Sequence, residues 1–351
     1  MKRITLCALL MALFLLLSCG NGTTNMEDPK TTFLTSIANL GKGFLDAFAS
    51  LSDMVTVAFG IKAETKKSDI GQYFTSIETT MNTVKEKLNT VVAENGNYPK
   101  IKEVVDTFIT NTLDKISDGA KEAAKGATGD DKIGGATNAG QDAVAADTTS
   151  VNALVKGIGQ IVGVVLRKGE GDPTITKTAE NEHKTIGKLF SEKKANGGID
   201  AQAAAASASV GAVIGADILK AIASSGDAVA GGVAINEAKD AASIAVGKTD
   251  NAQDLTVDSA KKDAVIAAGI ALRAMAKDGK FAAKAEEKSA HAVNGAAASA
   301  VGKTLSTLII AIRNTVDSGL KSISDALATV KQEDKSADSA TPTNAAAGGQ
   351  Q

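Results

Sequence analysis

Hydrophobic residues recur every three or four positions along most of this chain, which is the spacing of one face of an α-helix. The clearest case runs from Ile70 to Val91, where the apolar positions alternate between steps of four and three. That pattern is typical of a helix in a coiled coil or a helical bundle. No segment alternates convincingly between apolar and polar residues, as a half-buried strand would. The sequence therefore predicts an all-α fold.

Helix start and stop signals define the remaining predicted elements. Asp28 can accept hydrogen bonds at the N-cap of a first helix, and Pro29 suits its first turn. Pro99 begins another helix, and Gly279 follows the end of a third. The predicted helices cover residues 28 to about 60, 68–94, 99–116, 151–166, 185–194, 200–222, 258 or 259 to about 277, and about 283 to 335.

The N-terminus carries the features of an export signal. Two basic residues precede an apolar run at 4–17, and Ser18 and Cys19 follow it. The run is shorter than the ~20 residues that a permanent membrane-spanning helix needs. The Leu-Leu-Ser-Cys setting resembles a bacterial lipobox, which implies a signal peptide at 1–18, lipid on Cys19 and a polar tether at 19–27. The alternative is an ordinary signal peptide cut elsewhere, with Cys19 an incidental thiol.

Three stretches between the predicted helices are rich in small and polar residues. They lie at 117–149, 169–182 and 224–257, and contain few large apolar side chains, so we expect surface loops with weak helix. The long first and last helices each have an apolar stripe that needs a partner, so we expect them to pair near the membrane. The predicted fold is one elongated helical bundle over 28–335, with the loops at its distal end and a disordered tail at 336–351.

Composition limits what else the chain can be. Hydrophobic residues make up 44% of the 351 residues, but aromatic residues only 3%, with no tryptophan. A core must then be built mainly from Ala, Val, Ile and Leu, which suits closely packed helices. The formal net charge is −2, and there are few rings on which bases could stack, so we expect no nucleic-acid partner. A lipidated Cys19 would leave no thiol for a disulfide or a metal in the mature chain.

Two Gly-Lys-Thr triplets, at 247–249 and 302–304, look like the end of a phosphate-binding loop. That loop needs another glycine five residues before its last one, so that main-chain amides can surround a phosphate. Alanine stands at both positions, Ala242 and Ala297, and neither triplet follows a predicted strand. We therefore predict no nucleotide cofactor.

No arrangement of residues in the sequence predicts catalysis. Ser259 and Lys262 match the Ser-x-x-Lys pattern of acyl-serine enzymes, but the companion motifs are absent and we expect Ser259 to cap a helix. His183 and His291 are far apart in sequence, and we expect both to be polar surface residues. We predict that the protein is not an enzyme and that it holds no metal or cofactor.

The segment at residues 261–282 is distinctive: it reads KKDAVIAAGIALRAMAKDGKFA. By its own pattern it predicts a buried helix that stops at Gly279. It closely resembles the constant segment of the variable major surface lipoproteins of Borrelia, in particular the variable large proteins and the related VlsE antigen. Supporting matches lie at 40–48, 58–60, 66–69 and 318–321, so the resemblance spans essentially the whole chain.

The resemblance implies a function as well as a fold. Members of this family are all-helical lipoproteins anchored in the outer membrane by their N-terminus, here through Cys19. They serve antigenic variation and escape from host antibody. The resemblance also implies variable loops that cover the distal face and shield the constant helix. The three stretches described above are the candidates for those loops.

A second function stays open at this point: an adhesin that binds host glycosaminoglycans or matrix. Two groups of lysines could bind sulfated sugars, and solvated helix faces explain them equally well. Heparin binding that collapses with added salt would favour the adhesin. The two groups are Lys62, Lys66 and Lys67, and Lys184, Lys188, Lys193 and Lys194.

Overall fold

The computed structural model describes residues 29–49, 60–94, 98–193, 197–249, 252–331 and 334. The described residues form helices and connecting segments without a β-strand, and three isolated antiparallel bridges occur among them. The predicted all-α fold is confirmed. Cys19, the tether at 19–27 and the tail at 336–351 lie outside the described residues.

Contacts divide the chain into two compact units. Two helices, α4 (Lys67–Glu94) and α14 (Glu287–Thr329), contribute residues to both units. The single domain expected over residues 28–335 therefore stays a prediction. Unit 1 comprises Met1–Ala49, Val84–Ile109 and Ser318–Gln351, and unit 2 comprises Ser50–Thr83 and Thr110–Asp317.

Unit 1 is held together by close helix contacts at glycine. A Cβ atom placed on Gly43 of α2 (Pro29–Ala49) would overlap the side chain of Val91 in α4. Likewise, a Cβ on Gly319 of α14 would overlap the ring of Phe108, which ends α5 (Pro99–Phe108). These contacts join α2 to α4 and α5 to α14. The predicted pairing of the first and last long helices stays a prediction.

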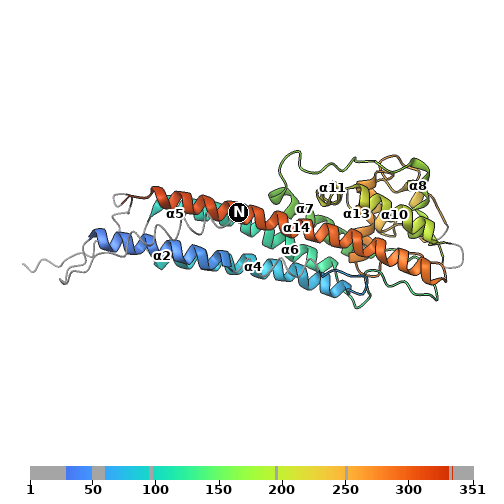
Figure 1. Ribbon diagram of the computed structural model, residues 1–351, viewed down its shortest axis with the longest axis horizontal. Coiled ribbons are helices and arrows are strands. Elements are labelled where there is room, and N and C mark those ends of the chain that lie inside the picture. Colours follow the sequence, from blue (N-terminus) through green and yellow to red (C-terminus); the bar gives the residue numbers. More distant parts are fainter. Residues whose placement is uncertain are drawn as a thin grey trace, which may run out of the picture. The chain divides into compact units, whose positions relative to one another are not determined.

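Unit 2 surrounds one short central helix. The helices that lie wholly in this unit are α6 (Asp114–Gly126), α7 (Thr148–Val165), α8 (Glu180–Thr185), α9 (Lys188–Ser191), α10 (Asp200–Ala212), α11 (Gly215–Ala223), α12 (Ala241–Ala245) and α13 (Asp263–Met275). The central helix is α13, which packs against α7, α10, α11 and α12, and Figure 1 shows it among its neighbours. A π-helical turn, η1 (Ile109–Leu113), leads from α5 into α6, and a 3-10 turn, η2 (Ile235–Glu237), precedes α12.

The expected loop at 117–149 is wrong for its first part, because residues 117–126 belong to α6. The small residues that suggested a loop instead let α6 approach α7 closely. A Cβ on Gly119 would overlap the carbonyl oxygen of Gly157, and a Cβ on Gly157 would overlap that of Gly119. Small side chains here mark a helix–helix contact, which sequence composition alone does not distinguish from a loop.

Several predicted helix boundaries also change. The single helix expected at 200–222 is two helices, α10 and α11, which meet at a bend of 99°. The short helix expected at 185–194 is replaced by α8 and α9. Ser259 does not cap α13, which begins four residues later at Asp263, and its hydroxyl donates to the carbonyl oxygen of Lys239 instead.

Candidate functional site

The central helix of unit 2, α13, is almost wholly buried: every residue of it except Val265 is buried. This confirms the buried helix expected within 261–282. The turn that follows α13 needs glycine at 279, because a Cβ there would overlap the carbonyl oxygen of Arg273. Asp278, just before it, has a positive φ of 64°. The stop signal read from the sequence is therefore correct.

The N-terminal end of α13 holds the segment between α7 and α8. Asp263 is fully buried, and its carboxylate accepts hydrogen bonds from the main-chain nitrogens of Lys177 (2.6 Å) and Thr178 (3.0 Å). The Thr178 hydroxyl donates to it as well, at 2.6 Å. Burial by itself would raise the pKa of Asp263, but these hydrogen bonds outweigh it and hold the pKa below its usual value.

His183 is buried beside that carboxylate, so its expected place on the surface is wrong. Its Nε2 lies 3.6 Å from Oδ1 of Asp263, and only 1% of the residue is exposed. The reason is local: α8 turns the imidazole inward onto the start of α13. His291, by contrast, is exposed on α14, as expected.

Two buried cations lie at the C-terminal end of α13. Lys67 donates to the carbonyl oxygens of Arg273, Ala274 and Ala276. Burial lowers the pKa of Lys67 to about 7. The Nε of Arg273 donates to the carbonyl oxygens of Val144 and Lys280.

The Arg273 guanidinium also lies over the ring of Phe190, with 5.2 Å between its carbon and the ring centre. This contact supplies a cation–π attraction inside the unit. Burial lowers the pKa of Arg273 to about 9, still well above neutral pH, so the guanidinium stays charged there. The sequence carries a signal for this site: Arg273 is a lone charge within an otherwise apolar run.

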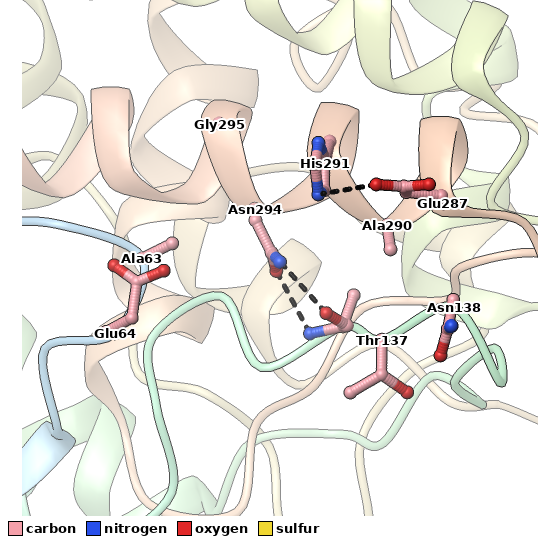
Figure 2. Close-up of a pocket in the computed structure, with 10 residues that line it drawn as sticks. Ala63, Glu64, Thr137, Asn138, Glu287, Ala290, His291, Asn294 and Gly295 are labelled. Carbon is pink, nitrogen blue, oxygen red and sulfur yellow. Dashed lines mark hydrogen bonds and ion pairs between the residues drawn. The ribbon is translucent and has the colours of Figure 1, made fainter.

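A pocket of about 610 Å³ lies where the start of α14 faces the segments around residues 63 and 137. Figure 2 shows Asn294 reaching from α14 to the loop that carries Thr137, while His291 pairs with Glu287 at 3.9 Å. The carboxylate of Glu64 lies on the other side of the pocket. Among the described residues, no group of three or more possible metal ligands comes together here or elsewhere.

Neither Gly-Lys-Thr triplet forms a phosphate loop in the structure. Lys303 lies within α14 and donates to the carbonyl oxygens of Val210 and Val213, both at 2.7 Å, so it satisfies the C-terminal end of α10. Lys248 follows α12, and its main-chain nitrogen donates to the carbonyl oxygen of Val233. In both triplets the lysine forms hydrogen bonds to main-chain carbonyl oxygens of other segments, which the sequence pattern did not indicate.

The family model described as Borrelia lipoprotein matches residues 44–327. The chain belongs to this family. It is 61% identical to Variable large protein 4 of Borrelia hermsii, over 98% of each chain. It is 59% identical to Variable large protein 17 of the same organism, over 100% of this chain and 99% of the relative.

A solved structure supports the family assignment. The crystal structure of the Lyme disease variable surface antigen VlsE of Borrelia burgdorferi matches with a TM-score of 0.73 and 36% identity. The match covers 84% of this chain and 98% of VlsE. The resemblance inferred from residues 261–282 is therefore confirmed.

Proposed function

We propose that this lipoprotein is a non-enzymatic antigen of the outer surface, held in the outer membrane by lipid on Cys19. Its role would be antigenic variation and the evasion of host antibody. One observation carries the proposal: the fold is shared with VlsE although about two thirds of the matched positions differ. Relatives from one organism also match over almost the full length while differing at about two positions in five. We infer that such proteins present different surfaces on one scaffold.

The distribution of buried and exposed residues supports a variable surface on a constant core. Changes at exposed positions usually cost less than about 0.5 kcal/mol, whereas removing a large buried side chain costs about 2–5 kcal/mol. The segments that join α6 to α7, α7 to α8 and α11 to η2 carry many exposed residues, and α13 carries almost none. Substitutions can therefore accumulate in these segments while the central helix keeps its sequence.

A chimera tests the proposal. Residues 127–147, 166–179 and 224–234 would be replaced together by the matching segments of Variable large protein 17, and the matched control would exchange α13 alone. Antisera raised against each parent would then be tested on intact cells. We expect recognition to follow the three exchanged segments and to ignore the exchange of α13. Recognition that follows the helices instead would overturn the proposal.

The alternative function, adhesion to host glycosaminoglycans or matrix, depended on groups of lysines. Lys67 is buried at the C-terminal end of α13 and Lys66 pairs with Asp130 at 3.1 Å, so the first group offers no cluster of three exposed cations. In the second group, Lys184 and Lys188 are partly buried. Lys194 lies outside the described residues. No observation among the described residues favours this function.

A further inference from the structure

In three exposed segments of unit 2, a polar side chain from a helix bonds main-chain atoms of the segment, beside other contacts such as the main-chain bond from Gln141 to Ala283. We call the segments loop A (127–147), loop B (166–179) and loop C (224–234). Asn294 of α14 holds loop A, Asp263 of α13 holds loop B, and Asn152 of α7 holds loop C; we call these three the anchor residues. Each pair is far apart in sequence, so the contacts are tertiary and not local turns.

The two asparagines make the same contact. Oδ1 of Asn294 accepts from the main-chain nitrogen of Ala136 at 3.0 Å, and its Nδ2 donates to the carbonyl oxygen of Ala136 at 2.9 Å. Oδ1 of Asn152 accepts from the nitrogen of Ala228 at 2.7 Å, and its Nδ2 donates to the carbonyl oxygen of Ala228 at 3.2 Å. In each case one amide group satisfies both polar main-chain atoms of a single loop residue.

Asp263 acts similarly on loop B, through acceptors alone. Its carboxylate accepts hydrogen bonds from the main-chain nitrogens of Lys177 and Thr178. The carboxylate of Asp217 in α11 accepts one from the main-chain nitrogen of Asp172, at 2.8 Å. Most of these bonds end on main-chain atoms of the loop. Thr178, which also uses its hydroxyl, is an exception.

Main-chain N–H and C=O groups are present whatever side chain a residue carries, proline excepted for the N–H. A loop held by such groups does not depend on its own side chains for its position. We propose that Asn152, Asn294 and Asp263 are positioning residues that help to fix the path of the three loops through main-chain atoms, so that most exposed side chains of the loops can change without moving them. This deepens the proposed function, on which it rests for its biological meaning.

The burial pattern around the anchor points agrees with this role. Ala136 and Ala228 are themselves buried, at 7% and 6% exposure, while residues beside them such as Thr137 and Val229 are exposed. Each asparagine therefore binds the main chain of one small buried residue, and residues next to that alanine face solvent. It follows that positions 136 and 228 require small side chains and that Gly135, with a φ of 74°, favours glycine, whereas the side chains of Thr137, Asp227 and Val229 face solvent.

Hydrogen–deuterium exchange of the full mature chain tests the proposal on loop C. We expect Asn152→Ala to speed exchange of the amides at 226–234 by about tenfold, because the loss of both bonds frees the loop to open locally. The matched control, Asp227→Ser with Val229→Thr, changes exposed loop residues and keeps the anchor. We expect exchange in the control to stay within about twofold of the parent chain.

A second pair of variants separates anchoring from general destabilisation. Asn152→Asp keeps the acceptor and loses the donor, so we expect an intermediate rate confined to loop C. Asn152→Ala could instead speed exchange throughout the chain, which would indicate general destabilisation. In that case Asn152→Asp and Asn294→Ala test the proposal, and it predicts that each speeds exchange only in its own loop. An unchanged loop in these variants, or an equal effect in the control, would overturn the proposal. The chimera experiment fails or succeeds independently, since it reads antibody recognition and not exchange.

Discussion

The ammonium group of Lys67 lies 2.8 Å from the main-chain carbonyl oxygen of Ala274 and donates a hydrogen bond to it. Two further bonds from the same group reach the carbonyl oxygens of Arg273 and Ala276, at 3.1 and 2.6 Å. These carbonyls stand at the end of α13, where a helix leaves its last acceptors without donors. A lysine more than 200 residues earlier in the chain thus closes the end of the buried helix.

Removing this cap should destabilise the fold. We expect Lys67→Met to lower the free energy of unfolding by about 1–3 kcal/mol near pH 7, because it leaves buried acceptors without a donor. Urea unfolding followed by circular dichroism measures the change. The matched control is Lys66→Met, since Lys66 is half-exposed and its pair with Asp130 should contribute less than about 1 kcal/mol.

The same residue predicts a dependence on pH. Burial lowers the pKa of Lys67 to about 7; Asp131 and Asp278 oppose the shift, and Arg273 and Lys280 add to it. The unfolded chain, with its ordinary lysine pKa of 10.5, binds the proton more tightly between those two values. Stability should therefore rise from pH 7 towards 10.5 in the parent chain more steeply than in Lys67→Met. Equal slopes would contradict this account of the buried ammonium.

Asp263→Asn tests the contact at the other end of α13. We expect a loss of about 1–3 kcal/mol at pH 7, because the amide offers one acceptor oxygen to donors that now share a carboxylate. The pKa of Asp263 lies below its ordinary 3.8, so its contribution is present above pH 3.8 and is lost as the pH falls through the lower, folded value. The difference between the two chains should shrink as the pH falls below 3.8, and a difference that stays constant as the pH is lowered until the chain unfolds would argue against it.

Two glycines on one helix test the contact between α6 and α7. Gly157→Ala should destabilise by about 1–3 kcal/mol, since its Cβ would overlap main-chain atoms of Gly119 and Ala123. Gly163→Ala, on an exposed side of α7 where a Cβ meets nothing within 4 Å, should stabilise by about 0.5–1 kcal/mol. Thermal unfolding of both variants gives the comparison. Shifts of the same sign would mean that the close approach at Gly157 does not matter.

Elements with large, regularly spaced apolar residues could be predicted from the sequence. The heptad between Ile70 and Val91 lies in α4, and the apolar run before Gly279 contains α13. The stretch at 117–126 could not be predicted, because alanine and glycine pack two helices closely and also populate loops. Element boundaries next to such residues were missed for the same reason, as at the bend between α10 and α11.

The polar contacts of unit 2 could be predicted only in part. Arg273 is a single charged residue in an apolar run, and that setting predicts that its side chain is buried. Asn152, Asn294 and His183 give no such signal. Their partners lie 76, 158 and 80 positions away, and only the fold brings them together.

Lipidation of Cys19 stays a prediction of the sequence and has a direct test. We expect cells grown with labelled palmitate to incorporate label into the parent chain and not into Cys19→Ser. The variant should also be depleted from the membrane fraction, because it lacks the acyl chains proposed to hold the parent chain there. Label that persists in Cys19→Ser would show that the lipid is attached elsewhere.

Limited proteolysis of intact cells, with mass spectrometry of the released peptides, tests the central claim that exposed loops cover a buried constant helix. The account predicts that the first cuts fall within residues 127–147, 166–179 and 224–234, and that 261–282 is released only after them. Early cuts within 261–282, with the loops still intact, would contradict it.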